Sequence, residues 1–461
     1  MKSIFLLAGM LVLSALACQA YPAPVATTPE AKPSPAASAT SLSATPTAVA
    51  PAAPVATARP TPPIPTAGPS PTLAASAVPT STLASELFAR LRASASPTPA
   101  ARPGEIPRPG PAIEGVEVAP TGSGGDGRPL WVAYTYGLKD YLSGPSHFVA
   151  VYTYDDARWQ ELGRLELKDP DVGYVARSTV KRVPVEPSGV WLEVPGGVGA
   201  HGGVYYILRF DGRQLKTEAS AAGSSPGVGN LSDLDSDGVL ELIIDQSDPY
   251  VFFYAASVRL YNVALFRWDG SRMAEVKLAR LSDSAPADLR RLVDAAIDHA
   301  NAELWKDAGA LAGQILALRP SDQTARWDAL LIRKIAEGRA IWAKDSPYPL
   351  IEQVFYGDYA ATLDIMRKYS PAQIFDRKSP LIVGTSAEGS RDQLEKWILE
   401  SADKAIAFKP DLAAAYFIRG WSHYLKNPGS AAALADVKKA ADLTPSDRLF
   451  ADSANYLSGN R

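Results

Sequence analysis

The chain has few residues with which to build thiol or imidazole chemistry. Its 461 residues include one cysteine and four histidines, and no two histidines have the H-x-x-x-H spacing of a helical zinc site. It has no phosphate-binding loop and no dinucleotide fingerprint. Its one G-x-S-x-G match, residues 223–227, contains Pro226 and predicts a loop rather than a strained nucleophile elbow. We therefore expect no enzymatic activity.

The chain also lacks an excess of either charge. Its 46 basic and 49 acidic residues leave a formal net charge of -3. Nucleic acid and anionic membranes attract proteins through clustered Lys and Arg, so this balance argues against both as charge-driven partners. We expect no nucleic-acid binding.

The N-terminus predicts export. In residues 1–17, Lys2 precedes an apolar run at 4–13 that is too short to span a membrane and ends in small residues. Cys18, the only cysteine, follows directly. This resembles the lipobox of bacterial lipoproteins, although Ala15 stands where leucine is preferred. The resemblance implies lipidation of Cys18 and an anchor to the cell membrane, with the protein facing outside or into the periplasm. The alternative is ordinary signal cleavage near Ala17 or Ala20.

Residues 18–112 have the composition of a disordered linker. Residues 19–112 hold 21 of the 39 prolines, among many Ala, Thr and Ser. Each proline fixes φ and removes a backbone donor, so neither helix nor sheet propagates. Residues 81–94 interrupt this composition with leucines at 83, 87 and 91, a helical spacing. We favour a transient helix in the linker over a short amphipathic helix that docks on an unspecified surface.

Residues 113–280 predict an all-β repeat domain. Three similar units each contain an apolar strand, a second strand and a tight turn, and the turns fall at 155–156, 211–212 and 269–270. Asp-Gly, present in the last two, is a strong hairpin signal because glycine tolerates the positive φ of the turn. Three units are fewer than the usual number of propeller blades, so a propeller-like fold and a sandwich both remain possible.

An acidic loop precedes the third unit. Its carboxylates and one backbone carbonyl are candidate oxygen ligands for Ca²⁺, contributed by Asp233, Asp235, Asp237, Val239 and Glu241. It is not an EF-hand, because Ile244 occupies position 12. The loop is similar to the calcium loop of FG-GAP and VCBS-type repeats, which implies a structural Ca²⁺. The alternative is a plain solvated turn.

Residues 281–461 predict an all-α domain of helical repeats. Pro410 and Pro445 each follow a predicted helix and are 35 residues apart, and Gly420 lies where helices approach closely. The pattern resembles tetratricopeptide repeats, which implies a superhelix of three to four repeats that binds proteins or peptides. Phe417, Trp421 and Tyr424 are the candidate groove residues; alternatively, they pack against the next repeat.

The combined prediction is a multidomain protein: signal peptide (1–17), lipid-anchored linker (18–112), β-domain with a calcium-type loop (113–280) and tetratricopeptide-like domain (281–461). Its expected function is extracytoplasmic binding or scaffolding through protein–protein interaction, with the membrane reached only through the lipid. The alternative is an extracellular, carbohydrate-active hydrolase with accessory repeats, because paired catalytic carboxylates have no fixed sequence spacing. The partner and the oligomeric state are not predicted.

Overall fold

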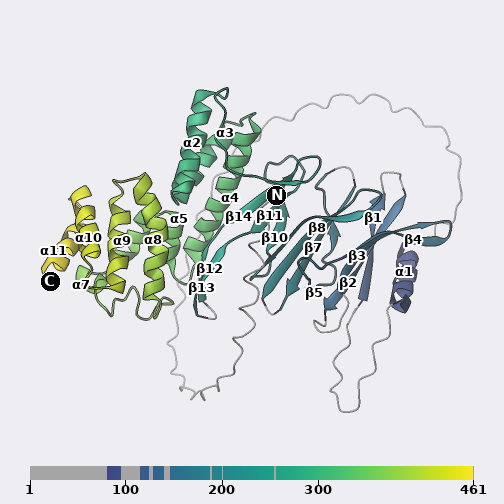
Figure 1. The fold of residues 1–461 in the computed structure, drawn as a ribbon, viewed down its shortest axis with the longest axis horizontal. Coiled ribbons are helices and arrows are strands. Elements are labelled where there is room, and N and C mark those ends of the chain that lie inside the picture. The colour runs from purple at the N-terminus through teal and green to yellow at the C-terminus, as the bar shows by residue number, and fades with distance from the viewer. Residues whose placement is uncertain are drawn as a thin grey trace, which may run out of the picture. The chain divides into compact units, whose positions relative to one another are not determined.

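A computed structural model describes residues 80–94, 115–123, 128–139, 146–186, 189–199, 201–253 and 256–459. The predicted signal peptide, Cys18 and the predicted linker apart from residues 80–94 lie outside these ranges. Within them, an antiparallel β region is followed by an all-helical region, as predicted (Figure 1).

The β region contains three antiparallel meanders of four strands each. The first consists of β1 (Gly115–Ser123), β2 (Pro129–Leu138), β3 (Phe148–Asp155) and β4 (Arg158–Glu166). The second consists of β6 (Lys181–Arg182), β7 (Val190–Val198), β8 (Gly202–Phe210) and β9 (Leu215–Gly223). Strand β5 (Tyr174–Val175) pairs with β2 and β7 and so joins these two meanders into one sheet.

The third meander is a separate four-stranded sheet. It consists of β10 (Gly229–Ser232), β11 (Glu241–Asp245), β14 (Val263–Trp268) and β15 (Met273–Glu275). A hairpin of β12 (Asp248–Phe253) and β13 (Ala256–Leu260) lies between β11 and β14 in the chain. All three predicted turns connect the last two strands of a meander. Gly212 and Gly270 adopt φ of 96° and 97°, the left-handed region that their turns require.

The third sheet is buried on both faces. Successive side chains of a strand point to opposite faces. Leu242 on β11 therefore belongs to an apolar cluster with Trp191 and Tyr205 of the second meander. Its neighbour Ile243 belongs to a different cluster, with apolar residues of the first helices of the helical region. The third sheet therefore packs on one face against the second meander and on the other face against the helical region.

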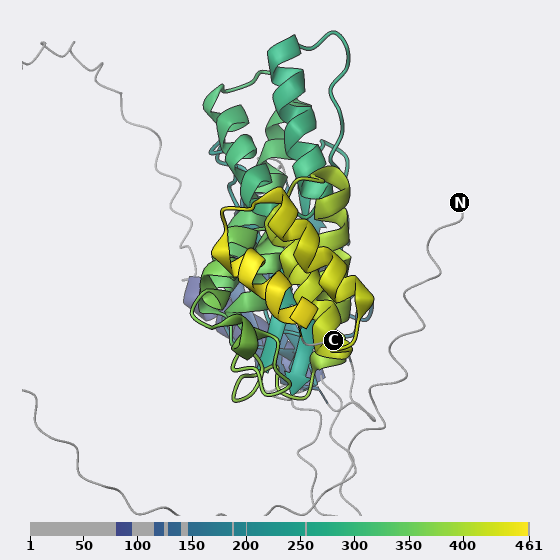
Figure 2. The ribbon, with the colours of Figure 1, turned by 90° about the vertical axis from the view of Figure 1, so that its left-hand side faces the viewer.

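The helical region begins with α2 (Ala287–Asn301), α3 (Trp305–Ala317) and α4 (Gln323–Asp345). The shorter α5 (Pro349–Tyr356), α6 (Tyr359–Met366) and α7 (Pro371–Ile374) follow. The region ends with α8 (Arg391–Phe408), α9 (Ala413–Lys426), α10 (Ala431–Leu443) and α11 (Arg448–Gly459). Consecutive long helices pack side by side, as Figure 2 shows for the C-terminal helices in yellow.

Helix α1 (Thr80–Ser94) corrects the preference for a transient linker helix. Leu83 and Leu87 are 8% and 0% exposed. They lie in an apolar cluster with Trp131 on β2, Tyr152 on β3 and Trp159 on β4. The leucines at i and i+4 form one face of the helix, and the aromatic side chains of the first meander cover that face. Residues 80–94 therefore pack with the β region.

Candidate metal centre in loop 233–241

The acidic loop connects β10 to β11, at the edge of the third sheet. Ser236 and Gly238 adopt φ of 62° and 87°, which turns the chain sharply between the two strands. A Cβ at position 238 would meet no atom within 4 Å, so the backbone conformation is what favours glycine there. The turn directs alternate side chains of the loop toward a common point.

Three carboxylates meet at this point. Each of Asp233, Asp235 and Asp237 offers an oxygen, and these atoms all lie within 4.8 Å of one another. The Asp233 carboxylate accepts the N–H of Asp237 (3.1 Å) and of Gly238 (3.0 Å), and Asp237 Oδ1 accepts the N–H of Val239 (2.8 Å). These backbone donors hold two of the carboxylates in place and offset part of their repulsion.

Asp235 is the most informative of the three. Its side chain is 5% exposed, and its Oδ2 lies 3.2 Å from Nη2 of Arg326 on α4. Its Oδ1 is buried without a hydrogen-bond partner among the residues that the structure describes. Burial, and then Asp237, raise the pKa of this carboxyl, while Arg326 opposes the rise. A buried carboxylate oxygen without a donor is costly, and a cation among the three aspartates would offset that cost.

Glu241 lies apart from the three aspartates. It is 2% exposed, and its Oε2 accepts the N–H of Leu234 at 2.9 Å. Burial raises its pKa to about 7, and the neighbouring aspartates add to the rise. The group of mutually close carboxylates does not include it. The loop thus combines the oxygen donors that hard divalent cations prefer, with three carboxylates at its centre.

Sequence reasoning missed Arg326. It contacts the loop twice, because its Nη2 also donates to the Asp235 carbonyl at 2.7 Å. The two residues are 91 positions apart in the chain. No local pattern pairs an arginine on a helix with an aspartate in a strand connection; folding of α4 against the third sheet brings them together. The candidate metal centre therefore lies where the β and helical regions meet.

Of the predicted groove residues, Phe417 and Trp421 lie in the helical core, which corrects their predicted role. Phe417 and Trp421 are both 0% exposed, and Tyr424 is partly buried against the same core. Phe417 lies 5.0 Å from Phe450 and Tyr424 lies 5.2 Å from Phe375, measured between ring centroids. The aromatic face of α9 is covered by α11 and by the segment after α7. The alternative, packing within the array, is what the structure shows.

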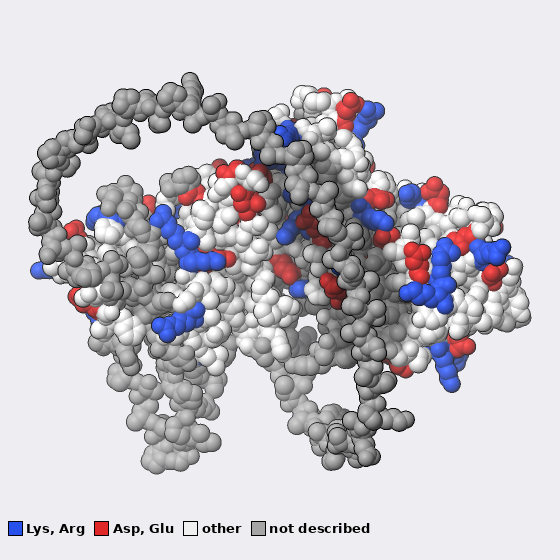
Figure 3. Space-filling view, turned by 180° about the vertical axis from the view of Figure 1, so that it is seen from behind, with Lys and Arg blue, Asp and Glu red and all other residues white. Residues whose placement is uncertain are grey.

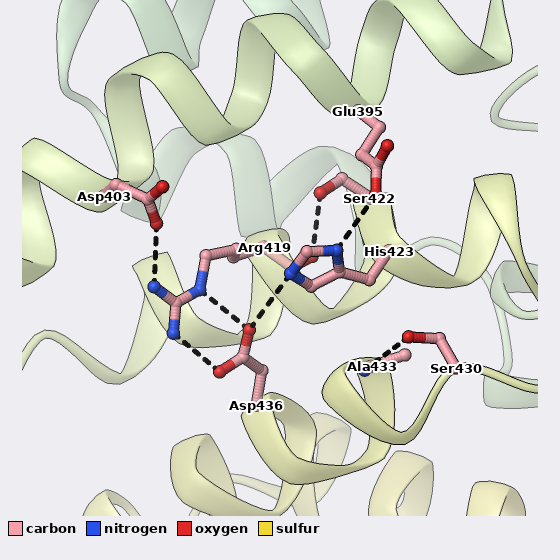
Figure 4. A network of polar contacts seen from close by, with 8 residues as sticks. All are labelled: Glu395, Asp403, Arg419, Ser422, His423, Ser430, Ala433 and Asp436. Carbon is pink, nitrogen blue, oxygen red and sulfur yellow. Dashed lines mark hydrogen bonds and ion pairs between the residues drawn. The ribbon is translucent and has the colours of Figure 1, made fainter.

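A polar network, also missed from sequence, joins α8, α9 and α10 (Figure 4). Arg419 donates to both oxygens of Asp436, each at 2.8 Å, and its Nη1 donates to Asp403 at 2.8 Å. His423, one turn further along α9, lies 3.0 Å from Glu395 through Nδ1. Bidentate pairing occupies both oxygens of Asp436. We interpret this network as a connection between helices.

The surface, the helices and the comparisons with known proteins add three findings. On the face shown in Figure 3, Lys and Arg are interspersed with Asp and Glu. In the described part of the chain, no helix is both long enough and apolar enough to cross a membrane. No protein-family model matches this chain, and neither do the curated proteins or the solved structures.

Proposed function

We propose that this chain is an exported, non-enzymatic binding or scaffold protein whose β region binds Ca²⁺ in loop 233–241. The observation that carries the calcium site is the buried Oδ1 of Asp235, which has no hydrogen-bond partner in the described part of the chain and lies beside two further carboxylates. Export and a lipid anchor at Cys18 rest on the N-terminal sequence alone. Binding of a protein partner rests on the tandem packed helices.

The expected role of the ion is structural. Asp235 belongs to the acidic loop and contacts Arg326 on α4. An ion bound by Asp235 would therefore lie where the β region meets the helical region. Its ligands lie in the connection between two paired strands, β10 and β11. A ligand that binds only the folded protein stabilises it by about 2.7 kcal/mol at one hundred times its dissociation constant. Calcium would therefore raise the stability of the third sheet and of its contact with α4.

The helical region carries the proposed binding function. In α9, a Cβ on Gly420 would lie 2.9 Å from the carbonyl oxygen of Ala433 on α10. Such a close approach is one of the features that carry the resemblance to tetratricopeptide repeats, together with the spacing of Pro410 and Pro445, and arrays of that kind bind proteins. Its groove would have to use residues other than Phe417 and Trp421, which are buried.

The calcium site is tested by calorimetry on the full protein after treatment with EDTA. We expect saturable Ca²⁺ binding and a higher melting temperature, both lost in Asp235→Asn and Asp237→Asn. Asp211→Asn is the matched control, because Asp211 lies at a hairpin turn of another meander. Absence of binding at millimolar Ca²⁺ would reduce the loop to a solvated turn and refute the calcium site.

The lipid anchor has its own test. Cells that express the protein are labelled with a radioactive fatty acid, and wild type is compared with Cys18→Ala. Label on the wild type alone supports the anchor. An unlabelled wild-type protein released into the medium supports ordinary signal cleavage instead.

A further inference from the structure

A cavity of about 530 Å³ lies between residues 234–236 of the acidic loop, the end of α3 and one face of α4. Its walls include Leu316 at the end of α3, and Leu330 on α4. The volume falls in the range of small-molecule sites in proteins.

Three arginines line this cavity. Arg326 and Arg333 are seven positions apart on α4, which places them on one face of the helix, and Arg319 follows α3. The side chains of Arg326 and Arg333 are 33% and 40% exposed, so both are reachable from solvent. Three arginines thus border one space.

Few negative charges oppose them. Asp235 is the one acidic residue among those that line the cavity, and Arg326 already pairs with it. Glu337 lies 3.7 Å from Arg333 and is 60% exposed, which is a weak surface pair. Among the described residues, the Arg319 side chain makes no ion pair, and Arg319 holds a φ of 49° where glycine is usual. The residues that line the cavity therefore carry a net positive charge, with Asp233 and Asp237 close by Asp235.

The chemistry of the cavity selects its ligand. Guanidinium groups bind carboxylate and phosphate through paired N–H donors, which a single point charge does not match. The two leucines offer an apolar surface beside them. We propose that this cavity binds a small amphipathic oxyanion, a phosphate or carboxylate that carries a short apolar group. This site goes beyond the calcium loop: it shares Asp235 with that loop but does not require a bound ion.

The test is calorimetry on the full protein in EDTA at low salt, with phenyl phosphate, benzoate, inorganic phosphate and phenol. Phenyl phosphate or benzoate should bind saturably, more tightly than inorganic phosphate, and phenol should not bind. The tighter of the two aromatic anions identifies the oxyanion. Because EDTA removes divalent cations, the result is independent of whether loop 233–241 binds Ca²⁺.

Variants locate the site. Arg333→Gln and Arg319→Gly should each weaken phenyl phosphate binding about ten-fold, the usual effect of losing one charged hydrogen-bond pair. Glycine at 319 keeps the φ of 49° without strain, so this variant removes only the side chain. Arg213→Gln, at an exposed hairpin turn, is the control and should bind normally. No saturable binding, or binding by both Arg333→Gln and Arg319→Gly equal to that of the wild type, overturns the proposal.

Discussion

The substitution Glu352→Gln should lower the stability of the protein at acidic pH and raise it at basic pH. Glu352, on α5, is 1% exposed, and its Oε1 accepts the N–H of Arg259 on β13 at 2.6 Å. Burial raises the pKa of Glu352 from 4.5 to about 7, although Arg339 and Arg259 lower it in part. The buried carboxyl thus connects the β12–β13 hairpin to the helical region in its protonated form below neutral pH.

The magnitude follows from the shift of this pKa. The folded protein holds the proton more tightly than the unfolded chain, so the stability that Glu352 contributes is complete below pH 4.5. It is lost as the pH rises through about 7. A change from 4.5 to about 7 corresponds to about 3 kcal/mol. Glutamine still accepts the Arg259 N–H but leaves its own amide donors unpaired, at a cost of about 1 kcal/mol.

The variant should therefore be about 1 kcal/mol less stable than wild type at pH 4, below the ordinary pKa of 4.5, and about 2 kcal/mol more stable at pH 9. Urea unfolding followed by circular dichroism at both pH values measures the two differences. Other raised carboxyls, such as Asp328, affect both proteins equally and cancel in the comparison. Glu337→Gln, 60% exposed on α4, is the control. A difference between Glu352→Gln and wild type that does not change with pH would refute the reasoning.

Three further predictions concern packing and coupling. Leu87→Ala should increase amide hydrogen exchange in residues 80–94 at least about ten-fold, because Leu87 is 0% exposed on the face of α1 that packs against the first meander. Unchanged exchange would contradict docking of this helix. Gly420→Ala should lower thermal stability by about 1–3 kcal/mol, since its Cβ would meet α10, while Gly313→Ala, with open space on α3, should be neutral or stabilising. Calcium and phenyl phosphate should each tighten the binding of the other by the same factor in calorimetry, because Asp235 and Arg326 are shared; equal affinities with and without the second ligand would separate the sites.

Features governed by neighbouring residues were predictable from the sequence. The three hairpin turns depend on residues within each turn; in the second, the Asp211 carboxylate accepts the N–H groups of Arg213 and Gln214. The convergence of Asp233, Asp235 and Asp237 likewise follows from their spacing in one short loop. Strand alternation and helical periodicity indicated where the β region ends and the helical region begins, since both patterns reflect the local backbone geometry.

Burial and long-range pairing required the tertiary structure. The spacing of Leu83 and Leu87 predicted a helix, but the aromatic surface that covers them comes from three strands of the first meander. Phe417 and Trp421 lie on one face of α9, and periodicity does not distinguish a face that binds a partner from one covered by the same chain. Arg326 meets Asp235 only because α4 packs on the third sheet. The sequence by itself determined the local backbone of this protein, whereas contacts between distant segments decided which faces are buried and which charges meet.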